Sequence, residues 1–149
     1  MWQNPLLPPH LFFQATLLGA AVLLPLTVVL RSASVMERFL GFMRPDAQWL
    51  LWILAISSFV HLLMVWGEVS MTHPTAHSRL AIWEMVQGRY RYEFWAGIAL
   101  SLLGGLLPLL ALLDVLTATI GIAGAPLALV GLMLFENAYV QAGQSVPLA

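Results

Sequence analysis

The sequence predicts an all-α membrane protein, a four-transmembrane-helix bundle with short interfacial helices in its connectors. Of its 149 residues, 60% are hydrophobic and only 9% are charged, whereas a soluble domain carries about 25% charged residues. The apolar residues gather in four long runs, and each run is long enough to cross about 30 Å of hydrocarbon as a helix. The charged residues fall mostly between these runs. We therefore expect one transmembrane bundle over residues 1–149.

The four predicted spans cover residues 10–30, 47–69, 94–113 and 119–139. The first span follows Pro8 and Pro9, which suit a helix start because a proline at that position loses no hydrogen bond. The third and fourth spans form one apolar stretch that is too long for a single crossing. Because Asp114 is the charge that interrupts this stretch, we place a tight turn there.

Two connectors are predicted to contain interfacial helices. Residues 35–43 are short and amphipathic, as is typical of a helix lying along the membrane surface. Residues 74–87 form a second such helix, and Gly88 follows as its stop. The expected apolar side of that second helix consists of Ile82, Met85 and Val86.

Small residues recur four apart in several spans, and small residues allow two membrane helices to approach closely. We therefore expect close packing on one face of the first span, on one face of the third, and along the fourth. The residues concerned are Ala15 and Gly19, then Gly97, Ser101 and Gly105, then Gly121, Gly124, Ala128 and Gly131.

The composition also excludes some function classes. The chain has six arginines, no lysine and a net charge of -1, so no basic run predicts nucleic-acid binding. It has no cysteine, which excludes a Cys-ligated zinc ion or iron–sulfur cluster on this chain. We expect no cofactor held by this chain and no metal site.

Two ionisable residues in the second span are the main candidates for function. His61 lies near the middle of the span, where an ionisable group is costly and is by default a functional hypothesis. It could bind a quinone, relay protons or ligate a haem; alternatively, it is a neutral ring bonded to a helix carbonyl. Glu68 lies seven residues on, on the same helix face and about 10.5 Å away. The two cannot bond directly, but they could be stations on one proton route together with Ser57 and Ser58.

The other polar residues allow both functional and structural interpretations. Glu68 could instead be an interfacial carboxylate paired with an arginine of the second connector. Glu136 could meet Glu68 because the second and fourth spans run parallel, or it could simply end its span. His73 and His77 are four apart, but no third ligand follows at a diagnostic spacing, so we predict no metal there. The arginines in question are Arg79, Arg89 and Arg91.

A haem would need two axial histidines at matching depth on facing helices. In the predicted spans His61 is central, whereas His10 lies at a span edge. This mismatch argues against a haem site between the two.

Two groups of residues resemble the second half of NrfD/polysulfide-reductase membrane subunits. The first group is the N-terminal run from Trp2 to Phe12, with Ala15 and the run from Gly19 to Ala21. The second group consists of Glu68, His77, the run from Gly88 to Tyr90, the run from Phe94 to Gly97, Gly104 and Pro108. Most of the chain is covered, and the order and spacing of these short pieces carry the resemblance.

The resemblance implies a membrane subunit that exchanges electrons with a quinone pool, menaquinone or ubiquinone, and binds no haem. It implies a companion NrfD-like subunit that supplies the first helix bundle, an iron–sulfur protein, and a molybdopterin or multihaem subunit. Iron–sulfur, molybdopterin or haem groups would then lie on those partner chains. The family's quinone-contacting residues lie largely in the first bundle, so none is transferred to a position here.

The function expected from the sequence is therefore a quinone-linked electron-transfer subunit in the inner (cytoplasmic) membrane, in contact with lipid and crossing it several times. It would be non-catalytic or would support a quinone site on its partner. His61, Glu68, Glu136 and His77 are the candidates for a proton path or for quinone-proximal positions. Two alternatives are a purely structural anchor of a larger redox complex and a b-type cytochrome anchor.

Overall fold

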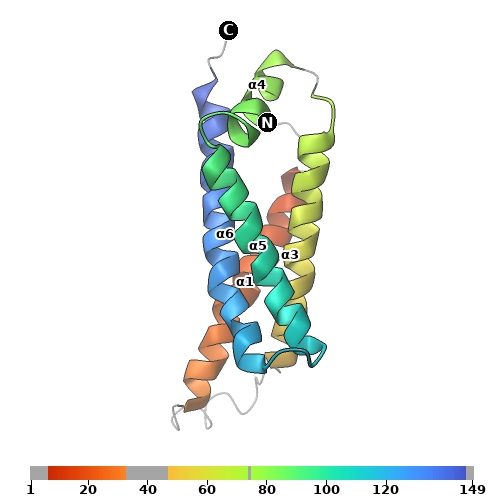
Figure 1. Cartoon of the computed structure of the whole chain (residues 1–149), viewed down its shortest axis with the longest axis vertical. Helices are drawn as coiled ribbons and strands as arrows, with labels where there is room; N and C mark the ends of the chain where they lie inside the picture. The colour runs from red at the N-terminus through yellow and green to blue at the C-terminus, as the bar shows by residue number, and fades with distance from the viewer. Residues whose placement is uncertain (1–6, 33–46, 74, 147–149) are drawn as a thin grey trace.

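The computed structural model describes residues 7–32, 47–73 and 75–146, and within these ranges it contains five α-helices and no strand (Figure 1). Four of them are long and apolar enough to cross a membrane, which confirms the predicted fold class. The predicted interfacial helix at 35–43 lies outside the described residues. The helices are α1 (Leu7–Ser32), α3 (Ala47–Ser70), α4 (Ala76–Val86), α5 (Arg91–Leu112) and α6 (Ala118–Ser145).

The long helices extend beyond the predicted spans, most clearly at the end of α6. That helix continues to Ser145 rather than ending at residue 139. A helix satisfies its own backbone hydrogen bonds, so it can continue past the hydrocarbon wherever packing favours it. Tyr139 and Ala142 are buried on one face of this extension, and they hold it against the rest of the bundle.

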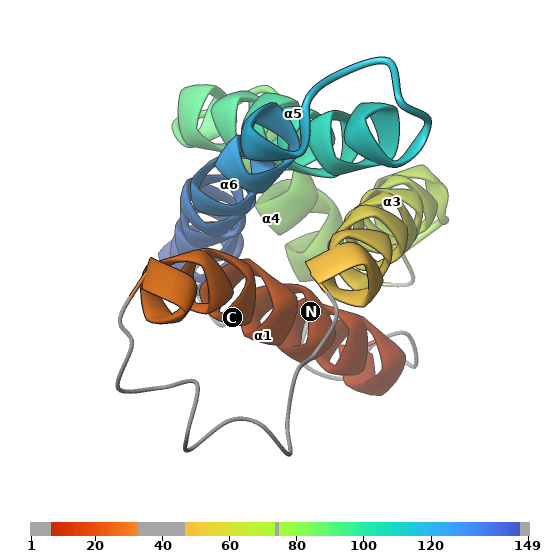
Figure 2. The same ribbon diagram turned by 90° about the horizontal axis from the view of Figure 1, so that it is seen from below.

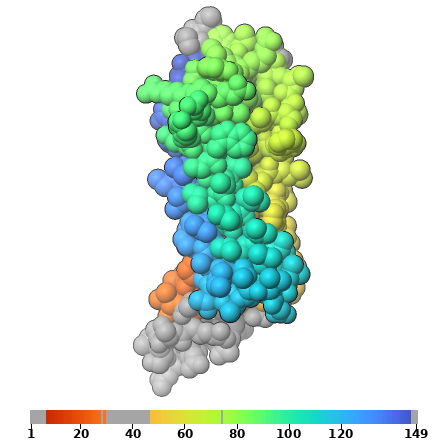
Figure 3. Space-filling model, viewed as in Figure 1, coloured from red at the N-terminus to blue at the C-terminus, as the bar shows by residue number. Residues whose placement is uncertain are grey.

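The four long helices alternate in direction and form a square (Figures 1 and 2). α1 packs against α3 and α6, and α5 packs against the same two helices from the opposite corner. In the space-filling view α5 runs along one face between α6 and α3 (Figure 3). The start of α1 and the end of α6 lie toward the same end of the bundle as α4 (Figure 1).

The short helix α4 lies across one end of the bundle, where it contacts α5 and α6. The hydroxyl of Thr75 accepts a hydrogen bond from the backbone N–H of Ser78 (3.2 Å) and caps its first turn. The predicted apolar side is only partly right. Met85 is buried, whereas Ile82 is half-buried, and Ser78 and Ala81 face inward instead. Ser78, Ala81 and Met85 are three and four residues apart, so they share one face of α4, and this face packs on α5 and α6.

Glycines bring α5 and α6 into backbone contact, as the sequence predicts. A Cβ on Gly131 would lie 2.6 Å from the backbone nitrogen of Ser101, and one on Gly104 would lie 2.7 Å from Cα of Ala128. Gly105 does not belong to this face. A Cβ there would meet the side chain of Ser58 on α3. The third span therefore has two close-packing faces, because α5 has two neighbours in the square.

The predicted close-packing face of α1 does not pack against the other described helices. Ala15 and Gly19 are exposed, and a Cβ on Gly19 would meet no atom within 4 Å. α1 turns its other side inward, because Leu17, Ala21 and Leu24 are fully buried there. Small residues mark where a helix can approach closely, but they do not say whether a neighbour is present.

The turn between α5 and α6 is the tight turn that Asp114 predicts. Asp114 has a φ of 57°, the left-handed conformation that typically follows a helix C-terminus. The N–H of Val115 donates to the carbonyl of Leu110 (3.0 Å), and the N–H of Asp114 donates to the carbonyl of Ala111 (3.3 Å). These two bonds form a Schellman motif and satisfy carbonyls at the end of α5.

The buried interior has two apolar clusters, one toward each end of the bundle. One cluster includes Leu17, Leu24 and Leu54 and lies in the half away from α4. The other includes Met85, Phe135 and Tyr139 and lies toward α4. The buried ionisable side chains of α1 and α3 all belong to this second half, and they define the candidate site.

Candidate functional site: a buried polar network

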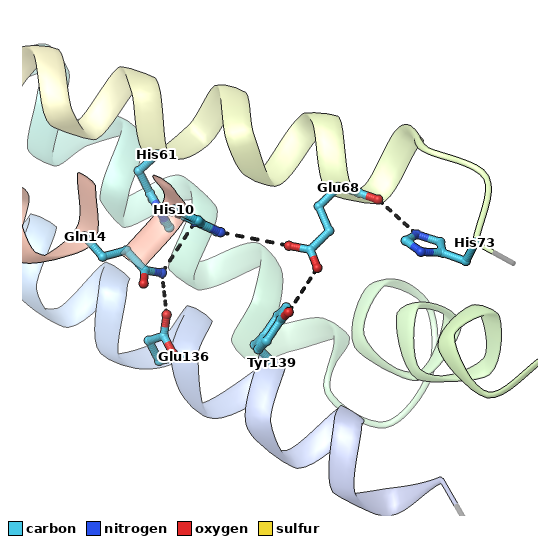
Figure 4. Close-up of polar contacts among 7 residues, drawn as sticks. All are labelled: His10, Gln14, His61, Glu68, His73, Glu136 and Tyr139. Carbon is cyan, nitrogen blue, oxygen red and sulfur yellow. Dashed lines mark hydrogen bonds and ion pairs between the residues drawn. The ribbon is translucent and has the colours of Figure 1, made fainter. Parts of the chain in front are cut away.

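Three spans place ionisable and amide side chains against one another inside the half of the bundle near α4 (Figure 4). Each span contributes two residues one or two turns apart, so both point to the same side of their helix. We call these six residues the polar network. They are His10 and Gln14 from α1, His61 and Glu68 from α3, and Glu136 and Tyr139 from α6.

The centre of the polar network is a direct bond between two imidazole rings. Nε2 of His10 lies 2.8 Å from Nδ1 of His61, and both residues are buried. The rings are tilted by 36° to each other, with 4.9 Å between their centroids. Phe135 packs against both rings, edge-on to His61 at 5.0 Å. Phe135 therefore holds the two rings in this orientation.

Glu68 lies at the outer end of the polar network. Its carboxyl oxygen Oε1 accepts a hydrogen bond from the hydroxyl of Tyr139 (3.0 Å), and Oε2 lies 3.9 Å from Nδ1 of His10. Glu68 is only 4% exposed although α3 ends at Ser70. Beyond it, Nε2 of His73 bonds to the backbone carbonyl of Glu68 (3.0 Å) and closes the end of α3.

Gln14 connects the histidine pair to the second carboxyl group. Its side-chain N–H₂ donates to Oε1 of Glu136 and also lies 3.4 Å from Nε2 of His10. An amide nitrogen has two hydrogens, so one Gln14 side chain can serve both partners. Gln14 therefore joins α1 to α6 at the level of the histidines.

These contacts favour one assignment of the ring hydrogens. The nearest atom of Gln14 is its side-chain nitrogen, which only donates, so we assign Nε2 of His10 as the acceptor. His61 then donates its Nδ1–H to that same nitrogen, and His10 turns its own Nδ1–H toward Glu68. This leaves Nε2 of His61 as a bare acceptor, and that atom is fully buried with no hydrogen-bond partner among the residues that the structure describes.

Below the histidines, two serine hydroxyls lie in the bundle interior. Ser58 is one turn before His61 on α3, and Ser101 lies on the neighbouring α5. Both are fully buried, and neither hydroxyl has a hydrogen-bond partner among the described residues. Ser57 instead donates to the carbonyl of Ile53 at 2.6 Å. Ser58 and Ser101 are therefore buried polar groups packed against the glycines Gly105 and Gly131.

The structure brings three of the four sequence candidates together. His61, Glu68 and Glu136 all belong to the polar network, and His10 bridges the first two, which do not bond directly. His77 lies in the first turn of α4, outside the four spans and partly exposed. The structure therefore does not bring His77 into the polar network.

Sequence reasoning missed His10, Gln14 and Tyr139. His10 was placed at a span edge, but α1 begins lower in the bundle than α3 ends, so the two histidines are level (Figure 1). The spacing of His10 and Gln14, four apart in an otherwise apolar helix, was a signal for a shared inward face.

The depth argument against a haem is therefore wrong, because His10 and His61 do lie at matching depth. Their separation is the relevant quantity. A metal held between two imidazole nitrogens needs each at about 2 Å, hence roughly 4 Å between axial ligands. At 2.8 Å the two nitrogens bond to each other instead.

Comparisons with protein-family models, with curated proteins and with solved structures found no match for this chain. The multi-pass membrane architecture therefore rests on the lengths and apolar composition of the helices themselves.

Proposed function

We propose that this chain is an integral membrane subunit of a quinone-linked electron-transfer complex, in which the polar network transfers protons. The observation that carries the proton-transfer role is the continuous arrangement of His61, His10 and Glu68 inside the bundle. Ionisable groups buried in a membrane are costly and typically mark proton relays or ligand pathways. Here the two histidines are also hydrogen-bonded to each other, and Glu68 lies 3.9 Å from His10.

The histidine pair can pass one proton without a net change in its own charge. A proton that binds Nε2 of His61 makes the Nδ1–H of that ring available to Nε2 of His10. His10 then releases its Nδ1–H to the Glu68 carboxyl group, after Oε2 has moved from 3.9 Å to hydrogen-bond distance of that nitrogen. One proton enters at His61, and one arrives at Glu68. Each ring ends neutral, with its hydrogen on Nε2 where it was on Nδ1 before. A reset requires the reverse transfer or rotation of the rings.

The quinone link rests on the resemblance to NrfD/polysulfide-reductase subunits. On this proposal a companion subunit supplies the first bundle, and an iron–sulfur protein with a molybdopterin or multihaem subunit supplies the redox groups. The membrane would be the inner (cytoplasmic) membrane. This chain would complete the bundle pair, and its polar network would carry protons linked to quinol turnover.

The proposal is tested on the intact complex, isolated in mild detergent through a tag on the full-length chain. We expect a second multi-span protein and an iron–sulfur subunit to co-purify, together with quinol-dependent electron transfer. Glu68→Gln and His61→Leu, made separately, should each lower coupled proton uptake by about tenfold or more. A tagged chain that recovers no redox subunit would contradict the quinone link.

A second candidate function is a purely structural anchor. One observation favours a structural role: the hydrogen bonds of the polar network connect α1, α3 and α6. A structural role predicts that Glu68→Gln lowers thermal stability while quinol turnover and proton uptake per assembled complex stay unchanged. Measuring both quantities on the same preparation separates the two functions.

A further inference from the structure

A pocket opens beside the polar network, between α1 and α6. His10 and Gln14 line it from α1, and Glu136 and Tyr139 line it from α6. Its volume is about 60 Å³ for water-sized occupants. Because one water needs about 10–15 Å³ on this measure, the pocket can hold a short row of water molecules. Leu11 and Val140 lie on its apolar wall.

Water has a less direct route to the polar network from the end of the bundle near Glu68. Glu68 is 4% exposed, its carboxyl faces Tyr139 and His10, and His73 bonds to the carbonyl of Glu68. α4 lies across the same end, where it packs on α6. The pocket reaches His10 and Glu136 from the side, and neither Glu68 nor His73 lines it.

We propose that this pocket is a hydrated vestibule, through which water exchanges protons with His10 and Glu136 from the side of the bundle. The lining supports water over lipid chains. A buried water needs two to four polar partners, and the four polar residues above supply them. Filling the same space with hydrocarbon would leave the remaining acceptor sites of the Glu136 carboxyl group without solvent, which is costly. The inference deepens the proposed proton path and is independent of the quinone link.

The absence of cysteine from the sequence provides the test, because one introduced cysteine is the only thiol on the chain. Leu11→Cys and Val140→Cys place a thiol on the pocket wall. Leu63→Cys is the matched control. Leu63 is 68% exposed on the outer side of α3, close in depth to His61. Each full-length variant is expressed in native membranes and treated with a positively charged, water-soluble thiol reagent, and separately with an uncharged lipophilic one.

A thiol must ionise to react, and it ionises poorly in apolar surroundings. We therefore expect the charged reagent to label the two pocket cysteines about tenfold faster or more than Leu63→Cys. The lipophilic reagent should label all three. Equal, slow labelling by the charged reagent would mean that lipid fills the pocket. Labelling of the pocket cysteines by neither reagent would mean that another subunit covers it. Either of these results overturns the vestibule.

A second measurement is proton uptake by the complex carrying Leu11→Trp. Leu11 is 52% exposed at the pocket, so a larger ring there fills the pocket while the polar network stays intact. We expect proton uptake to slow severalfold, with unchanged co-purification of the partner subunits. Unchanged uptake overturns the vestibule as the place where water exchanges protons with His10 and Glu136. A complex without quinol activity in every variant, the unmodified chain included, would instead count against the quinone link.

Discussion

Replacing Gly131 with leucine is expected to separate α5 from α6 and to destabilise the whole bundle. A Cβ at this position would lie 2.6 Å from the backbone nitrogen of Ser101 and 2.9 Å from the carbonyl oxygen of Gly97. Backbone atoms cannot rotate away as a flexible side chain can. Overpacking a well-packed core costs about 1–3 kcal/mol. A loss of about 3 kcal/mol lowers the unfolding midpoint by roughly 6–12 °C for a chain of this size, as thermal unfolding in detergent would record.

Gly19→Leu is the matched control for this prediction. It makes the same change in another span, but a Cβ on Gly19 meets no atom within 4 Å. We expect its unfolding midpoint to stay within a few degrees of the unmodified chain, since replacing glycine in a helix is itself mildly favourable. Equal losses in the two variants would show that the α5–α6 contact is not the main constraint on the bundle.

Replacing His10 with phenylalanine is expected to abolish most proton uptake by the complex. Phenylalanine keeps a ring against Phe135, where the ring centroids are 5.8 Å apart, but it lacks both nitrogens. His61 and Glu68 then have no bridge between them, and seven residues of helix, about 10.5 Å, are too far for direct transfer. Uptake should fall by about tenfold or more, as measured with a pH-sensitive dye in proteoliposomes.

His73→Phe is the control for the His10 variant. His73 also lies beside Glu68, but it bonds to the backbone carbonyl and not to the carboxyl group. Its replacement should leave proton uptake within about twofold of the unmodified complex, since the path does not pass through this ring. Unfolding midpoints of both variants show whether a loss of uptake comes from misfolding. A stable His10→Phe complex with full uptake would remove His10 from the path.

The fold class could be predicted because membrane insertion depends on local quantities. Four apolar runs of sufficient length are visible in the sequence, and Asp114 marks the turn between the last two. The glycines of α5 and α6 also predicted a close contact, which the structure shows. The inward side of α1 was predicted wrongly because the small residues Ala15 and Gly19 were followed, whereas the polar residues His10 and Gln14, four apart, mark the side that is buried.

The candidate site could be predicted only within one helix. His61 and Glu68 share a face because of their spacing, and this follows from helix geometry alone. Their partners come from other helices, and the heights of those helices depend on tertiary packing. α1 begins at Leu7 and not at residue 10, so His10 lies inside the helix, and the packing of α1 on α3 places it beside His61. Tyr139 was assigned to the end of a span, but α6 continues beyond it and keeps it buried.

The most direct test of the proton-transfer network is the protonation of its two histidine rings. Nitrogen-15 NMR of the full-length chain in lipid bilayers can assign each ring nitrogen and detect coupling across the bond between them. We predict a hydrogen on Nδ1 of His61 that is shared with Nε2 of His10, and no hydrogen on Nε2 of His61. Two rings that each carry their hydrogen on Nε2, with no coupling between them, would contradict the network.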